Sequence, residues 1–172
     1  MGRKVRLCAA VLLMAMFLNG CSMTTVEKMY SPPKRSEEYN NLQNAIDAVM
    51  EDHVYCAPLS GENQQLVQAV DLDGDGFQEY LLFAKGSSDK PLHIFVFSGD
   101  GAQYQLLDTI VSTGSAFDRV EYIQMDDQPG CEIVVGRQVS EQVVRTVSVY
   151  SLKNGQIEQV MSADYTQFLI CD

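Results

Sequence analysis

The sequence lacks most of the residue patterns that accompany catalysis. Its 172 residues include two histidines, His53 and His93, and no HExxH, GxSxG or glycine-rich phosphate-binding pattern. Catalysis needs groups that move protons or attack a substrate from a defined geometry, so the sequence does not favour an enzyme. His53 follows a predicted helix and His93 lies in a predicted strand, and both are interpreted as packing or surface residues. Ser60, in "PLSGEN", is interpreted as a turn residue.

Basic residues are also scarce. The chain has 12 lysines and arginines against 23 aspartates and glutamates, and its formal net charge is −11. Polyanions repel so acidic a chain, which argues against nucleic acid as a partner and against an electrostatic attachment to anionic lipid.

No apolar run is long enough to span a bilayer comfortably as a permanent helix. The stretch "LCAAVLLMAMFL" follows Arg3, Lys4 and Arg6 and precedes "LNGC", which ends at Cys21. This order closely resembles a bacterial lipoprotein signal, which implies that residues 1–20 are removed and that Cys21 carries lipid. An ordinary secretory signal or a membrane anchor is the alternative. We therefore expect a lipid-anchored protein on the extracytoplasmic face of the cell membrane.

Three cysteines follow Cys21, namely Cys56, Cys131 and Cys171. An odd number excludes a complete disulfide framework. Cys131 and Cys171 are interpreted as small apolar residues beside strands.

The chain after Cys21 begins with a polar tether and a helix. Residues 21–35 contain two adjacent prolines and are predicted to link the membrane to the domain. A helix is predicted over residues 36–52, because Ser36 suits a helix start and apolar residues recur at helical spacing. This apolar stripe, which we expect to pack on the domain, consists of Leu42, Ala45, Ile46, Val49 and Met50.

From residue 64 the period of the apolar residues changes to two, which indicates β-strands. The strand candidates, separated by turn formers such as "SGDG" and "KNG", are "QLVQAV", "EYLLFA", "LHIFVFS", "YQLLDTI", "RVEYIQM", "EIVVGRQ", "RTVSVYSL" and "QIEQVMS". In "LHIFVFS", Leu92, Ile94 and Val96 occupy one face and Phe95 and Phe97 the other. This strand is therefore predicted to lie in a sheet that is covered on both sides.

The order of elements repeats. "LVQAVDLDGDGFQEYLLFAKG" is echoed by "VEYIQMDDQPGCEIVVGRQ", with Glu79 matching Glu132 at an interval of 53 residues. We therefore expect a mainly β fold: two consecutive four-stranded antiparallel blade-like repeats of a partial β-propeller, about 64–115 and 116–165, preceded by one helix. A third echo begins at "FLICD". Because two units leave open sheet edges, we interpret the chain as a fragment of a longer protein or as a short chain that needs a partner.

The loop "DLDGDGFQE", residues 71–79, places four acidic side chains between two predicted strands. Asp71, Asp73 and Asp75 can converge only where the backbone curls, which the two glycines of the loop permit. Like charges at such close range repel strongly, so a hard cation with oxygen ligands is predicted there. Leu82 stands at loop position twelve, where an EF-hand needs a bidentate acid, so an EF-hand is not favoured.

Glu79 is the closing ligand that this loop offers. The pattern Asp-x-Asp-x-Asp-Gly-x-x-Glu between two strands resembles the calcium loop of FG-GAP and VCBS-type repeats, the blades of integrin-alpha-like propellers. Over about residues 64–172, the resemblance implies calcium held by Asp71, Asp73, Asp75, Phe77 through its carbonyl, and Glu79. Together with "LNGC" and "YSPPKRSEEYNNL", the chain also looks like repeat lipoproteins of Gram-positive gut bacteria, a resemblance that implies no activity.

The equivalent loop of the second repeat departs from this pattern. In place of the three aspartates and Gly76 it has Gln124, Asp126, Gln128 and Pro129. Calcium is therefore not favoured there. Its acidic residues, Asp126, Asp127 and Glu132, are interpreted as solvated turn residues.

We therefore expect an exported, lipid-anchored cell-surface protein that is not an enzyme. Its calcium-binding loop would belong to a binding or scaffold module with a protein or glycan ligand. One alternative is a surface hydrolase that acts on glycans with paired carboxylates such as Asp126 and Glu132. Another is a spacer for a missing C-terminal region.

Overall fold

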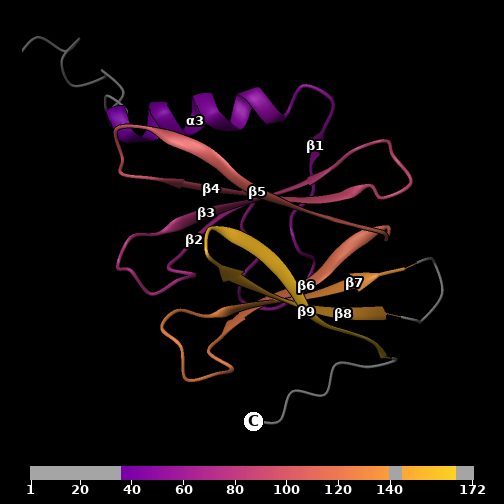
Figure 1. Ribbon diagram of the computed structural model, residues 1–172. Coiled ribbons are helices and arrows are strands. Elements are labelled where there is room, and N and C mark those ends of the chain that lie inside the picture. Colours follow the sequence, from indigo (N-terminus) through magenta and orange to yellow (C-terminus); the bar gives the residue numbers. More distant parts are fainter. Residues whose placement is uncertain (1–35, 140–144, 166–172) are drawn as a thin grey trace, which may run out of the picture. The chain divides into compact units, whose positions relative to one another are not determined.

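The computed structural model describes residues 36–139 and 145–165. In these residues the fold is mainly β, with one helix and nine strands that form two open antiparallel sheets (Figure 1). Within the same residues, no helix has the length and apolar character needed to cross a membrane. The predicted signal peptide (1–20), Cys21, the tether (21–35) and the third echo at "FLICD" lie outside the described residues.

The helix, α3 (Glu37–Val49), begins where the side chain of Ser36 caps it. The Oγ of Ser36 accepts the amide of Tyr39 at 3.2 Å, which satisfies one of the free amides of the first turn. Ile46 is buried at the centre of the apolar stripe, and the other four stripe residues pack beside it against the first sheet. The sheet residues in this cluster are Leu82, Ala84, Phe95 and Phe97.

The first sheet has five strands: β1 (Val54–Tyr55), β2 (Val67–Val70), β3 (Glu79–Lys85), β4 (Leu92–Gly99) and β5 (Tyr104–Ser112). β1 and β2 both pair with β3, β1 along its last residues and β2 along its first. β1 was not predicted. It spans two residues that are both exposed, which is too short to produce a period of two.

The second sheet has four strands in chain order: β6 (Ala116–Ile123), β7 (Glu132–Gln138), β8 (Arg145–Lys153) and β9 (Gln156–Tyr165). All eight predicted strands are therefore present, as β2 to β9. The two sheets also share one pairing register: Val67 pairs with Leu82, and 53 positions later Val120 pairs with Val135. The β-bulge after Val96 recurs at the same interval, after Val149.

The two sheets stack with unlike faces. Leu81 and Phe83 of β3 lie in the core that both sheets share, whereas Val134, the counterpart of Leu81 in β7, does not. Its neighbours Ile133 and Val135 take that place, and they correspond to Tyr80 and Leu82, which pack against α3. The face of β3 that lies in the shared core therefore corresponds to the face of β7 that is directed away from it. The first sheet is covered on both sides, as "LHIFVFS" predicted.

The segment between β1 and β2 reaches across to the second sheet. The amide of Leu59 donates to the carbonyl of Phe117 at 3.1 Å, and that of Ser60 to the carbonyl of Asp118 at 2.8 Å. The Oγ of Ser60 donates to the same carbonyl at 3.0 Å. Ser60, which the sequence suggested as a turn residue, therefore joins the two sheets through a β-bridge with Arg119.

Candidate metal centre

The loop between β2 and β3 is folded by its own aspartates. The two carboxylate oxygens of Asp71 accept the amides of Gly74 at 2.7 Å and Gly76 at 3.0 Å. Asp73 and Asp75 each accept the amide two residues further on, at 3.1 and 2.7 Å. Gly74 and Gly76 have φ of +76° and +90°, a region that glycine enters without steric cost. The backbone therefore curls around the aspartates.

Glu79 closes the loop from the first position of β3. Its side chain is 4% exposed, and its Oε2 accepts the amide of Leu72 at 2.9 Å. Burial raises the pKa of this carboxyl, and the charges of Asp73, Asp75 and Asp71 raise it further, while the Leu72 amide acts in the opposite direction. Without a cation, the charged form of Glu79 is thus disfavoured.

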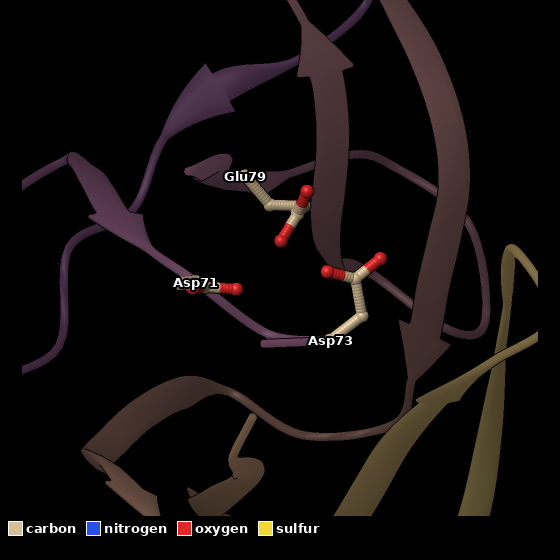
Figure 2. A group of neighbouring side chains, drawn as sticks. All are labelled: Asp71, Asp73 and Glu79. Carbon is tan, nitrogen blue, oxygen red and sulfur yellow. The ribbon is translucent and has the colours of Figure 1, made fainter. Parts of the chain in front are cut away.

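Three carboxylates converge in this loop. Asp71, Asp73 and Glu79 each offer an oxygen, and these oxygens all lie within 4.8 Å of one another. Figure 2 shows the three side chains directed toward the same space, Glu79 from the strand and both aspartates from the loop. Because a cation would relieve the repulsion between them, this group could hold a metal ion.

Two of the five predicted ligands lie outside this acidic group. Asp75 is exposed, and its Oδ1 accepts the amide of Phe77. The ring of Phe77 is 64% exposed. Both residues line a cavity of about 250 Å³ beside Asp73 and Glu79, which leaves room for water ligands. Asp75 and the Phe77 carbonyl remain predictions as ligands.

The loop between β6 and β7 repeats the closure by glutamate but not the acidic group. The Oε2 of Glu132 accepts the amide of Met125 at 2.8 Å, as Glu79 accepts that of Leu72. Gln124 replaces Asp71, and its Nε2 donates to the carbonyl of Gln128 at 3.0 Å. At the position that Asp71 holds in the first loop, a neutral side chain thus bonds across this loop. Its acidic residues form no metal-binding group among the residues that the structure describes.

Glu132 is not the solvated turn residue that the sequence suggested. It is 8% exposed, and its carboxylate accepts the Met125 amide and the Oγ of Ser151, the latter at 3.3 Å. Long-range packing against β8 buries it, which a local run of polar residues does not reveal. Asp126 and Asp127 are exposed as expected. Asp126 and Glu132 both line a cavity of about 240 Å³.

The two loops are in direct contact, which the sequence did not predict. The amide of Cys131 donates to the carbonyl of Leu72 at 3.2 Å, and its Sγ lies 3.6 Å from the carbonyl oxygen of Asp71. Leu72 is 3% exposed and belongs to the core between the sheets. Burial raises the pKa of the Cys131 thiol, so the thiol stays protonated and can donate this bond.

The two histidines meet away from the acidic loop. His53 and His93 lie edge to face with their ring centroids 4.6 Å apart, and both contact the ring of Phe95. The Nδ1 of His93 is bonded to the carbonyl of Pro91 at 3.0 Å. Both histidines therefore pack in an aromatic cluster.

The site is an all-oxygen acidic group in a loop between two strands of a β-sheet domain. A scan against protein-family models and searches of curated proteins and of solved structures found no match to this chain. The geometry of the site therefore carries the functional proposal.

Proposed function

We propose that the protein is an exported, lipid-anchored binding or scaffold module whose loop 71–79 binds calcium. The observation that carries this proposal is the convergence of the Asp71, Asp73 and Glu79 carboxylates within 4.8 Å. Bound calcium stabilises the native fold by mass action and holds β2, β3 and the loop between them together.

The donor set favours calcium over transition metals. Its three side chains offer only oxygen atoms, the ligand type that hard cations select. The thiol of Cys131 is directed at the Asp71 carbonyl instead. Calcium takes six to eight oxygen ligands in flexible geometry, and a curled loop with a backbone carbonyl and a water-accessible side can supply them more easily than the strict octahedron that magnesium requires.

The repeat geometry supports a blade-like array. The shared register at an interval of 53 residues and the stacking of unlike faces are what propeller blades or related arrays require, because each unit must present one face to its neighbour's opposite face. The resemblance to FG-GAP and VCBS-type repeats fits this arrangement. The proposed ligand of the module is a protein or a glycan.

Calcium binding is tested with a matched pair of variants. Asp73→Asn removes one charge from the acidic group, and Asp126→Asn makes the same change at the counterpart position of the second loop. We expect calorimetry to detect calcium binding to the wild type and to Asp126→Asn, with greatly weakened binding to Asp73→Asn. EDTA should lower the Tm of the wild type and of Asp126→Asn. The proposal would be refuted if EDTA left the Tm of the wild type unchanged and calorimetry detected no calcium binding to it.

Membrane attachment is tested at Cys21. If this residue is lipidated, cells fed an alkyne fatty acid should label the protein, and Cys21→Ser should abolish the label and leave the protein outside the membrane fraction. Equal labelling of the two proteins would argue against the anchor.

A surface hydrolase acting on glycans is the second candidate, favoured by the cavity that Asp126 and Glu132 share. The burial of Glu132, which is 8% exposed, weakens this candidate, because a catalytic carboxylate must come within hydrogen-bond reach of the substrate. This candidate predicts turnover that Asp126→Asn abolishes. Absence of turnover by the wild type on a broad glycan panel would count against it.

A further inference from the structure

The loop that carries the acidic group rests on the second loop through residues that are not ligands. Leu72, between Asp71 and Asp73, is fixed at three points. Its amide donates to Glu79, its carbonyl accepts the amide of Cys131 at 3.2 Å, and its side chain is buried in the core between the sheets. A displacement of the second loop would therefore move the backbone on both sides of Leu72, where the two aspartates lie.

Glycines allow the two loops to approach this closely. A Cβ at Gly130 would lie 2.2 Å from the carbonyl oxygen of Leu72, and a Cβ at Gly74 would lie 2.4 Å from the Cβ of Pro129. Neither distance is sterically tolerable, and at Gly130 the obstacle is backbone, which cannot rotate away. The contact thus depends on the absence of a side chain at Gly130.

We propose that the second loop is a positioning platform for the metal loop, so that Gly130 and Cys131 determine the calcium affinity of Asp71, Asp73 and Glu79 without touching the ion. This inference rests on the calcium binding proposed above. Because coupling between two sites is reciprocal, calcium also holds the second loop, and with it the second sheet, against the first.

The counterpart of Leu72 in the second loop marks the difference in role. Met125 has the same bond to a glutamate, Glu132, but its side chain is 55% exposed instead of buried in the shared core. The first loop is therefore held through Leu72, which contacts the second loop and the core. The second loop has no such anchor at Met125, which is exposed.

The test compares two alanine substitutions at glycines with left-handed backbone. Gly130→Ala and Gly101→Ala share the strain of positive φ, +97° and +86°, but the nearest atom to a Cβ at Gly101 is a carbon of the Glu38 side chain at 3.6 Å, an ordinary contact. We expect Gly130→Ala to weaken calcium binding about tenfold or more, within the usual range for coupled sites. Gly101→Ala, which lies outside the cavity beside the acidic group, should bind like the wild type. Calorimetry with calcium chloride measures all three.

A second measurement uses the wild type alone, in case Gly130→Ala fails to fold. Calcium should slow hydrogen exchange of the Cys131 amide. It should leave unchanged the exchange of the Ser115 amide, which donates to the Gln138 carbonyl at 2.7 Å at the other end of the β6–β7 pair. If calcium binds but leaves the Cys131 amide unaffected, or if the two alanine variants bind equally well, the platform is refuted while calcium binding stands. If the wild type binds no calcium, both proposals fail.

Discussion

The loops 71–79 and 124–132 share a closure by glutamate, but only the first gathers its carboxylates into one group. In each, a buried glutamate at the start of a strand accepts the amide seven residues earlier. The first loop uses Asp71 to gather two backbone amides and brings three carboxylates together, whereas the second uses the neutral amide of Gln124. The comparison teaches that closure of the loop by a buried glutamate does not require a cluster of negative charge. The aspartates of the first loop fold its backbone, and the three carboxylates that converge there could in addition hold a cation, which would relieve their repulsion.

The largest expected effect comes from the anchor beneath the first loop. Leu72→Ala should lower the free energy of unfolding by about 2–5 kcal/mol, because it leaves a cavity in the core between the sheets. Met125→Ala, at the exposed counterpart position, should change it by less than about 0.5 kcal/mol. Urea denaturation followed by circular dichroism measures both. Equal losses would show that the two loops are anchored alike.

The next largest effect is expected when the neutral residue of the second loop, Gln124, is copied into the first loop at Asp71. Asp71→Gln should abolish the stabilisation by calcium, which for the wild type is about 2.7 kcal/mol at a calcium concentration one hundred times Kd. Without calcium the unfolding free energy should change by less than about 1 kcal/mol, because a glutamine can bond across the loop as Gln124 does. Denaturation with and without calcium separates the two terms. A variant that still responds to calcium would remove Asp71 from the site.

The reverse exchange should create a site. Gln124→Asp, Gln128→Asp and Pro129→Gly together give the second loop the acidic pattern of the first, and the calcium stoichiometry in calorimetry should rise from one to two. The new site should be the weaker, because Met125 is exposed where Leu72 is buried. An unchanged stoichiometry in a folded variant would mean that the carboxylates are insufficient without an anchor.

The smallest expected effect is at Glu79, where the effect of a substitution on stability should change sign when calcium is added. Without calcium at neutral pH, Glu79→Gln should stabilise the protein, since the raised pKa means that folding disfavours the charged carboxyl. A carboxyl with a raised folded-state pKa loses stability as the pH rises through the unfolded and folded values. The advantage of the variant should therefore vanish at a pH below the ordinary value of 4.5. With calcium the wild type should be the more stable, and thermal melts across pH test both statements.

The sequence predicted the parts of the fold that depend on local pattern. All eight predicted strands are present, and they could be predicted because period-two alternation and turn residues mark them. The stripe centred on Ile46 packs against the first sheet, as expected. Asp71, Asp73 and Glu79 were identifiable from spacing, because the loop folds on bonds to its own amides.

What depends on distant packing could not be predicted. β1 is too short to show a period. The burial of Glu132 arises partly from Ser151, and the role of Leu72 arises from Cys131, in both cases through contacts between separate elements. Nothing in "DLD" distinguishes its leucine from a solvent-exposed one. The stacking of unlike faces likewise becomes visible only when the two sheets are placed together.

α3 covers one face of the first sheet. The corresponding face of the second sheet is covered by the first sheet. A helix and a sheet thus cover corresponding faces of the two sheets, so the two ends of the stack are not equivalent. For protein engineering, this indicates where the proposed repeat could be multiplied. Under the proposed array a further unit would follow β9, since one inserted ahead of β2 would have to displace the helix from a surface that it already fills.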